Sequence, residues 1–368
     1  MKRKILFFLY RLAGGGAERT TINIINNLDK DKFDVVLVLG TSNNNDYGDL
    51  LEPNVRVKIL NSKKLRYSIF KLRRIIRKEK PDLLFSTINE NNILLLLAKF
   101  VALYRKPVIV REASHRTESG NVSVINRIIT SILYNRLSSS IVALSEGVKG
   151  DLVDNFKISK DKIKVIYNPI EIDKIKKMSV ERVTDFKQED DEKVIIAVGR
   201  LTEAKDYRTL LRAFKIVSEN VKSKLIILGK GKLEEELKNL CDHFGVSEKV
   251  LFLGFKSNPY KYMKTSDLFV LSSRWEGFGH VIVEAMATGI PVISTDCKSG
   301  PKEIINDKYG VLVPVSDFKK LSSEIIKMLN NDDKRNRLSK LGYERSKKFH
   351  VKKIIKEYEK LFINEIND

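Results

Sequence analysis

Short apolar runs alternate with stretches of helical spacing along the first half of the chain. Seven runs have the length and composition of buried strands, and they span residues 5–10, 34–40, 55–60, 82–87, 107–112, 140–145 and 163–169. Between two of these runs, Leu65, Ile69, Leu72 and Ile76 recur at the spacing of one helical face. This alternation is typical of parallel sheets that helices cover on both faces.

The second half repeats the alternation after a polar, acidic stretch over residues 178–193. Six further apolar runs span residues 194–199, 224–229, 250–254, 267–273, 291–295 and 310–314. Near the end, Val351, Ile354, Tyr358 and Leu361 share one helical face. We expect an α/β protein of two Rossmann-like domains, divided into an N-terminal domain, a linker, a C-terminal domain and a closing helix that returns to the N-terminal domain (residues 1–168, 169–192, 193–346 and 347–368).

Composition narrows the class of protein. At 368 residues with 42% hydrophobic content, the chain is globular and long enough for two domains. Cys241 and Cys297 lie far apart without metal-ligand spacing, which predicts a reduced, cytoplasmic protein and no metal site. The opening "MKRKILFFLY" resembles a signal peptide, but Arg11 interrupts it early, so a buried strand is the better interpretation. The apolar run that Lys99 breaks is too short to span a bilayer.

Candidate chemistry follows the predicted strands, and ligands of open parallel sheets bind beyond the carboxyl ends of strands. After the first strand, Gly14-Gly15-Gly16 would let the backbone approach a ligand closely. The run satisfies neither the dinucleotide fingerprint nor the P-loop, which needs a lysine. A strand-to-helix turn that merely needs glycine explains it equally well. With two such domains facing each other, we expect the site in the cleft between them.

Two cations follow the first strand of the second half. Arg200 comes just after the strand and Lys205 five residues later, an arrangement that suits a diphosphate. By spacing alone, two solvated surface cations remain the better explanation. After another strand, the backbone around Phe255 and Lys256 could hold a flat heterocycle, or it could form an ordinary turn.

The stretch "RWEGFGHVIVEA" places two carboxylates beside a turn that favours anions. Free N–H groups at a glycine-bracketed helix start attract a phosphate, yet Glu276 and Glu284 flank this one. Ionised carboxylates only accept hydrogen bonds, so they suit the hydroxyl groups of a ligand that is also anionic. A nucleotide sugar has both kinds of group. Alternatively, Glu284 lies on a helix surface and Glu276 stabilises the helix dipole.

These residues resemble glycosyltransferases of the GT-B type in family 4 (GT4). The most specific part is E-G-F-G-x-x-x-x-E from Glu276 to Glu284, and the resemblance covers nearly the whole chain. It implies that Arg200 and Lys205 bind the donor diphosphate, Glu284 the ribose hydroxyls and the backbone near Lys256 the base. It further implies that the transferred sugar is held by a set of residues in the turn: Glu276, Gly277, Phe278 and Gly279.

In the first domain, the resemblance implies that Gly15 and Gly16 approach the phosphates or the acceptor. His115 matches a family histidine near the anomeric carbon, although a loop histidine without a role remains an alternative. The family implies transfer from a nucleoside-diphosphate sugar, expected to be a UDP-sugar, with retention and without a metal. The D-x-D at Asp29–Asp31 lies in a predicted helix-to-strand loop and is taken as accidental.

One departure concerns the donor loop, where many relatives carry paired glycines and this chain has Ser299-Gly300-Pro301. This form, together with "GGAER", resembles transferases that build lipid-linked or capsular oligosaccharides, often from N-acetylhexosamine donors. The expected acceptor is therefore a hydroxyl of a lipid-linked or surface-polysaccharide saccharide, and the expected sugar is an N-acetylhexosamine or a hexose.

Charge adds a possible membrane partner. Residues 1–168 hold 30 Lys and Arg against 16 Asp and Glu, a net +14 of the total +21. A basic amphipathic helix within residues 63–80 could bind the anionic inner face of a bacterial membrane, which makes the protein peripheral. Alternatively it is a packed helix with a solvated outer face. The membrane-facing candidates are Lys63, Lys64, Arg66, Lys71, Arg73, Arg74, Arg77 and Lys78.

Two rival functions remain open. A sugar-nucleotide epimerase could share the two-domain architecture, and it would need no acceptor. A nucleic-acid-binding protein could share the high pI, but the sequence has no recognition motif. We therefore expect no nucleic-acid partner.

Overall fold

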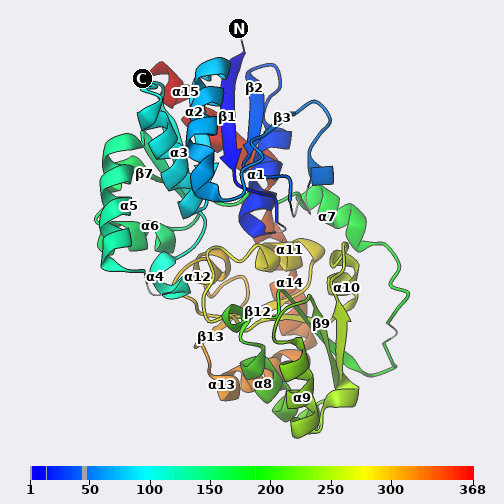
Figure 1. The fold of residues 1–368 in the computed structure, drawn as a ribbon. Coiled ribbons are helices and arrows are strands. Elements are labelled where there is room, and N and C mark those ends of the chain that lie inside the picture. The colour runs from blue at the N-terminus through cyan, green and yellow to red at the C-terminus, as the bar shows by residue number, and fades with distance from the viewer. Residues whose placement is uncertain (1, 14, 44–47, 121, 187) are drawn as a thin grey trace. The chain divides into compact units, whose positions relative to one another are not determined.

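The computed structural model describes residues 2–13, 15–43, 48–120, 122–186 and 188–368. The chain forms two compact units (Figure 1). The first unit comprises Met1–Pro169 together with Val351–Asp368, and the second comprises Ile170–His350. Each unit is built around its own parallel sheet, which confirms the α/β prediction.

The first unit contains a seven-stranded sheet in the order β3-β2-β1-β4-β5-β6-β7. All its neighbouring strands pair in parallel. The strands are β1 (Arg3–Leu9), β2 (Phe33–Leu39), β3 (Arg56–Ile59), β4 (Leu83–Thr87), β5 (Val108–Glu112), β6 (Ser140–Ala143) and β7 (Ile163–Val165). The helices are α1 (Gly16–Asn27), α2 (Ser68–Glu79), α3 (Asn89–Val101), α4 (Arg116–Ser119), α5 (Val124–Leu137), α6 (Glu146–Asp154) and α15 (Val351–Asn367), with 3-10 turns η1 (Gly48–Leu50), η2 (Leu65–Tyr67) and η3 (Lys160–Lys162).

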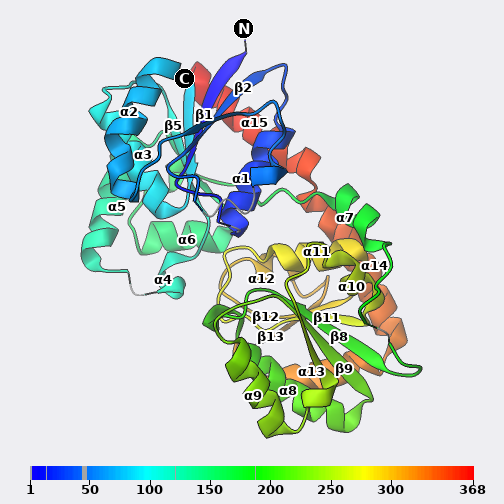
Figure 2. The same ribbon diagram turned by 45° about the vertical axis from the view of Figure 1, so that its right-hand side comes forward.

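Helices cover both faces of this sheet because its strands are apolar on both sides. Phe7 and Phe85 pack with residues of α1 and α15 in one hydrophobic cluster. On the opposite face α2, α3 and α5 lie in succession (Figure 2), and α3 packs against both of its neighbours. Leu72 and Ile76 of the predicted helical stripe are fully buried.

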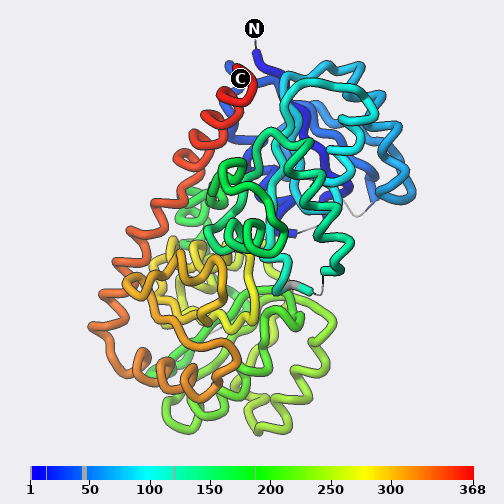
Figure 3. The backbone as a smooth tube through the Cα atoms, turned by 90° about the vertical axis from the view of Figure 1, so that its left-hand side faces the viewer, coloured from blue at the N-terminus to red at the C-terminus, as the bar shows by residue number. Residues whose placement is uncertain are grey.

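The C-terminal helix completes the first unit. Figure 3 shows α15 in red, running beside the sheet that the start of the chain forms. Tyr358 and Phe362 are fully buried, and the Phe362 ring contacts the rings of Phe7, Phe33 and Phe85. Aromatic packing therefore holds the final helix in the first unit.

The second unit contains a six-stranded parallel sheet in the order β10-β9-β8-β11-β12-β13. Its strands are β8 (Lys193–Val198), β9 (Ser223–Leu228), β10 (Val250–Gly254), β11 (Leu268–Leu271), β12 (Val292–Thr295) and β13 (Val311–Val313). Its helices are α7 (Ile172–Ser179), α8 (Tyr207–Asn220), α9 (Glu234–Phe244), α10 (Tyr260–Thr265), α11 (His280–Thr288), α12 (Pro301–Ile305), α13 (Phe318–Leu329) and α14 (Asp332–Ser346), with 3-10 turns η4 (Glu203–Lys205), η5 (Ser247–Lys249) and η6 (Lys347–Phe349).

Most of the stretch that we expected as a linker packs as part of the second unit. Ile172 and Ile175 of α7 are buried, and α7 packs against α10 and α11. The Asn258 side chain donates to the carbonyl oxygen of Met178 at 2.9 Å. The buried face of α7 and this hydrogen bond attach the start of the expected linker to the second unit. In the described part of the chain, no helix has the length and hydropathy to cross a bilayer.

Candidate functional site

Three loops of the second unit lie together at the carboxyl edge of its sheet. One follows β8 and carries Arg200 and Lys205, a second follows β11 and carries Glu276, and a third follows β12. Because β8 pairs with β11 and β11 with β12, the three loops leave the sheet side by side. The parallel topology thus gathers residues that are far apart in sequence.

Lys205 and Glu276 form a direct ion pair between two of these loops. The Glu276 oxygen that accepts from the Lys205 ammonium also accepts from Ser273 Oγ at 2.7 Å. The two charged side chains are only 19% and 12% exposed. Burial strengthens such a charge-assisted bond, so each group fixes the position of the other. Sequence reasoning assigned both residues to the site but missed this pairing.

Arg200 differs from Lys205 in its environment. Its side chain is exposed, and its guanidinium has no hydrogen bond or ion pair within the described residues. A free guanidinium presents a planar set of donors to an incoming phosphate. The two predicted diphosphate ligands are therefore unequal, because one is free and the other is held by a carboxylate.

Close backbone packing shapes the loops after β8 and β9. A Cβ atom at Gly229 would lie 1.9 Å from the carbonyl oxygen of Gly199, and one at Gly231 would lie 2.2 Å from that of Leu201. Glycine is needed at both positions because a side chain would force the two loops apart. Sequence reasoning passed over this pair, although the run "LGKGK" was a visible signal.

The turn before α11 is braced from the loop after β12. Ser299 Oγ donates to the carbonyl oxygen of Glu276. Gly300 has φ of 79°, and a Cβ atom there would lie 2.2 Å from the carbonyl oxygen of Phe278. The Ser299-Gly300-Pro301 form is thus the packing partner of the turn, and Gly279, with φ of 87°, caps α11.

Glu284 and Lys256 have side-chain partners within the second unit. Glu284 is 7% exposed, and Tyr260 donates its hydroxyl to Glu284 Oε1 at 3.3 Å. Lys256 Nζ pairs with Asp185 Oδ2 at 2.5 Å, and this bond raises the pKa of Lys256. Only the backbone was assigned to the base in this loop, and the lysine side chain is directed to Asp185.

In the first unit, the glycine loop starts α1. Gly14 lies outside the described residues, Gly15 is the N-cap and Gly16 is the first helical residue. A Cβ atom at Gly15 would lie 2.3 Å from Glu18 Oε2, the end of a flexible side chain that could move aside.

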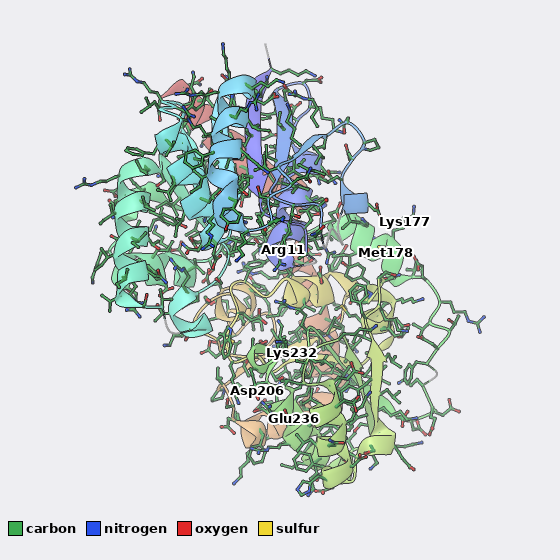
Figure 4. The ribbon with its side chains drawn as sticks, viewed as in Figure 1. Arg11, Lys177, Met178, Asp206, Lys232 and Glu236 are labelled. Carbon is green, nitrogen blue, oxygen red and sulfur yellow. The ribbon has the colours of Figure 1, made fainter. Side chains whose placement is uncertain are left out.

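A pocket of about 230 Å³ opens at the carboxyl ends of β1, β2 and β3. Its lining includes Arg11, labelled in Figure 4. Ser62 Oγ is buried there without a hydrogen-bond partner among the described residues. No local sequence pattern predicts this pocket, because its lining comes from three separate loops: Tyr10, Arg11, Thr41, Asn43, Ser62 and Lys63.

His115 follows β5 and lies beside a carboxylate. Its Nδ1 lies 3.5 Å from Asp151 Oδ2, and the residue is 9% exposed. Asp151 also accepts from the backbone N–H of Arg116 at 2.8 Å. The carboxylate therefore lies beside the imidazole ring, although Nδ1 has no hydrogen-bond partner among the described residues.

The chain matches two family models in succession. Residues 14–174 match the model described as "Glycosyltransferase Family 4", and residues 181–345 match "Glycosyl transferases group 1". A Campylobacter jejuni protein named as the N-acetylgalactosamine-N,N'-diacetylbacillosaminyl-diphospho-undecaprenol 4-alpha-N-acetylgalactosaminyltransferase is 31% identical, covering 96% of this chain and 98% of that protein. The chain therefore belongs to the glycosyltransferase family that these models and this relative represent.

Further similarities agree with this family. An Escherichia coli protein named as the UDP-Gal:alpha-D-GlcNAc-diphosphoundecaprenol alpha-1,3-galactosyltransferase is 25% identical, over 87% of this chain and 85% of that protein. Among solved structures, Anabaena HepE in complex with UDP and glucose has a TM-score of 0.82 at 21% identity, covering 98% of this chain and all of HepE. This likeness shows that the glycosyltransferase has the GT-B fold.

The D-x-D stretch of this glycosyltransferase has a local role. Asp29 accepts from the backbone N–H of Asp31 at 2.9 Å and pairs with Lys32 at 2.7 Å. Its carboxylate therefore stabilises the turn between α1 and β2. Within the described residues, no group of three or more His, Cys, Asp or Glu side chains could hold a metal ion.

The predicted membrane-facing residues of the glycosyltransferase divide into two groups. Lys71 Nζ donates to the carbonyl oxygens of Leu60 and Asn61 at 2.8 and 3.1 Å, and Arg77 Nε donates to that of Ala102 at 3.2 Å. Arg73 is half-buried. Lys71 and Arg77 are nevertheless exposed, as are Lys63, Lys64, Arg66, Arg74 and Lys78.

Proposed function

We propose that this glycosyltransferase transfers a sugar, with retention, from a UDP-sugar to a hydroxyl of a lipid-linked saccharide. The observation that carries the proposal is the Lys205–Glu276 ion pair beside the free Arg200, all at the carboxyl edge of one sheet. The printed names of two relatives, both acting on undecaprenol diphosphate-linked sugars, support the acceptor class. The same names support an N-acetylhexosamine or a hexose as the transferred sugar.

In the proposed donor complex, Arg200 and Lys205 bind the diphosphate. The Lys205 ammonium then exchanges part of its interaction with Glu276 for a phosphate oxygen. The Glu276 carboxylate remains fixed by Ser273 and accepts a hydrogen bond from a hydroxyl of the sugar. The ion pair therefore holds both groups in position before the donor arrives, which lowers the cost of ordering them on binding.

The proposed chemical step is the departure of the nucleoside diphosphate. The bond between the anomeric carbon and the diphosphate oxygen breaks, and negative charge develops on the leaving oxygen. Arg200 and Lys205 stabilise this charge electrostatically. The leaving phosphate accepts the proton of the attacking acceptor hydroxyl on the same face, so the configuration is retained. His115, whose Nδ1 lies 3.5 Å from Asp151 Oδ2, is assigned to the neighbourhood of the anomeric carbon.

The remaining assignments concern the ends of the donor. Glu284, buried beside Tyr260, accepts hydrogen bonds from the ribose hydroxyls. The backbone at Lys256 holds the base. Gly15 and Gly16 lie close to the phosphates or the acceptor. No metal is required in this scheme, because two cationic side chains neutralise the diphosphate.

We further propose that the enzyme binds the cytoplasmic membrane peripherally. The exposed cations of α2 support this location, since each basic residue near an anionic surface contributes about 1 kcal/mol. Peripheral binding would bring the active site to an acceptor anchored in lipid.

The proposal is tested by supplying UDP-sugars and undecaprenyl diphosphate-linked saccharides and following UDP release and product configuration. Lys205→Ala and Glu276→Gln should each lower kcat/KM by about 100-fold or more, as the loss of charge stabilisation does elsewhere. Lys319→Ala, an exposed lysine on α13, is the matched control and should leave turnover unchanged. The wild type should work equally well with EDTA present.

Three results would contradict the proposal. Normal turnover of Lys205→Ala would remove the diphosphate assignment. An inverted product would remove the same-face step. Conversion of the donor to its epimer without any acceptor would make the enzyme an epimerase instead.

A further inference from the structure

Helix α5 exposes an aliphatic face. Its exposed apolar residues lie at positions i, i+1, i+4, i+5 and i+8, which is one side of a helix. Their exposed fractions range from 41% to 70%, and they are Val124, Ile125, Ile128, Ile129 and Ile132. No charged side chain interrupts this face between Val124 and Ile132, because Arg127 is half-buried.

The opposite side of α5 is polar and faces the protein. Thr130 and Tyr134 are fully buried, and Tyr134 donates its hydroxyl to the buried Glu112. The helix is therefore amphipathic in the reverse sense, since its hydroxyl groups face inward and its isoleucines face outward. Contiguous apolar surface of this kind marks an interaction site in a soluble protein.

The layer that contains α5 is strongly basic. Helices α2, α3 and α5 cover one face of the sheet in succession (Figures 1 and 2), with α3 packed against both neighbours. In residues 63–106, all of which the structure describes, Glu90 is the one exposed carboxylate. The exposed cations of the same segment are Lys63, Lys64, Arg66, Lys71, Arg74, Arg77, Lys78, Lys80, Arg105 and Lys106.

The same layer carries further exposed apolar side chains beside its cations. Phe70 of α2 is 72% exposed, while Phe100 and Leu103, at the end of α3, are 62% and 79% exposed. Aromatic and aliphatic side chains flanked by Lys and Arg match an interfacial segment, in which apolar groups enter the lipid and cations contact anionic headgroups.

We infer that the α5 face, defined as Val124, Ile125, Ile128, Ile129 and Ile132, inserts into the surface of an anionic phospholipid bilayer. This inference rests on the proposed function in its choice of occupant, and it assigns the insertion to α5 rather than to the basic helix α2. The cations of α2 and α3 attract the membrane, and the α5 face anchors the enzyme on it. A second copy of the chain fits less well, because two such basic layers would repel each other.

The test is binding to vesicles of phosphatidylcholine with and without phosphatidylglycerol, measured by co-sedimentation without donor or acceptor. Ile128→Glu should weaken binding to the anionic vesicles by about tenfold or more, because a carboxylate replaces an aliphatic group that would enter the lipid. Val180→Glu is the matched control, since Val180 is 76% exposed and follows α7 in the second unit. Its binding should stay within about twofold of the wild type.

The depth of α5 in the bilayer is a second measurement, and an unfolded variant would not reproduce its expected result. An Ile128→Trp variant should be quenched by brominated lipid in the vesicles, whereas a Val180→Trp variant should show only the background of the natural Trp275. Circular dichroism checks that each variant is folded.

Each other outcome overturns the inference. Binding of Ile128→Glu equal to that of the wild type, or an unquenched Ile128→Trp on bound vesicles, would exclude insertion of α5. A wild-type dimer that Ile128→Glu dissociates would show that a second copy covers the face. Because vesicle binding needs no turnover, failure of the proposed transferase reaction would leave this result readable, and the reverse also holds.

Discussion

At the scale of single residues, Glu112 shows how the first unit buries a carboxyl group beside its candidate histidine loop. The residue ends β5, and it is 1% exposed. Its carboxyl group accepts from Tyr134 and from Asn92, and burial raises its pKa above the ordinary value. The neighbouring Arg111 is fully buried and bonds to Thr87 and Tyr358. At the end of β5, the buried interior thus consists of polar side chains that are hydrogen-bonded to one another.

The raised pKa of Glu112 predicts a pH dependence of stability. Because the folded state holds the proton more tightly than the unfolded state, the stabilisation is complete below about pH 4.5 and is lost as pH rises through the folded pKa. Glu112→Gln keeps an acceptor for Tyr134 but cannot ionise. Relative to this variant, the wild type should lose free energy of unfolding as pH rises from about 4.5, in urea titrations at a series of pH values. Parallel curves for the two proteins would contradict the prediction.

The candidate site also depends on single residues that the sequence placed only partly. Arg200, Lys205, Glu276 and Glu284 were all named from their types and their positions after strands. Their partners were not, since Glu276 lies 71 residues from Lys205 and no local pattern links the two. A contact between loops of neighbouring strands is decided by the order of strands in the sheet.

At the scale of elements, the turn between β11 and α11 depends on the glycine that packs beneath it. Gly300 combines a positive φ with a Cβ position only 2.2 Å from the backbone of Phe278. Gly245, which caps α9 with φ of 67°, has nothing within 4 Å of its Cβ position. Comparing substitutions at the two glycines therefore distinguishes the cost of backbone strain from the cost of a steric clash.

Gly300→Ala should cost clearly more stability than Gly245→Ala. Gly245 has the left-handed helical conformation, in which alanine costs about 1–2 kcal/mol. Gly300 also has a positive φ, so both variants should lose stability in thermal unfolding. Only Gly300→Ala must also displace the turn, so it should additionally weaken UDP binding in calorimetry. Equal losses of stability with unchanged UDP affinity would show that the loop after β12 does not brace the turn.

Helix α5 illustrates an element whose existence is local but whose orientation is not. A helical pattern of isoleucines ordinarily predicts a buried stripe. Here the inward side meets Glu112 and Asn92, and Tyr134 supplies the hydrogen bonds that these buried groups need. Satisfying buried polar groups outweighed burying the isoleucines, which are left outside.

At the scale of the whole molecule, the first unit is assembled from the two ends of the chain. Residues 351–368 belong to the same unit as residues 1–169. Phe362 is fully buried among Phe7, Phe33 and Phe85. The first unit is therefore complete only after the last helix has been synthesised.

Removing this anchor should destabilise the first unit selectively. Phe362→Ala should cost about 3–5 kcal/mol, as buried Phe truncations do, whereas Phe100→Ala, at a side chain 62% exposed, should cost little. Hydrogen exchange distinguishes the units, since amides of β1 and β4 should exchange faster while those of β8 and β11 stay protected. Equal loss of protection in both sheets would mean that the two units unfold together.

The sequence by itself determined where the strands of both sheets lie along the chain. All thirteen predicted apolar runs overlap a strand. Central strands such as β1 and β4 are buried on both faces and must be apolar along most of their length, so their identity is local. The glycine turns and the charged residues after the strands were visible for the same reason. Only the tertiary structure decided strand order, the pairing of Lys205 with Glu276, the pocket at Arg11 and the outward face of α5. Each of these depends on which distant residues become neighbours, and a single sequence pattern carries no information about that.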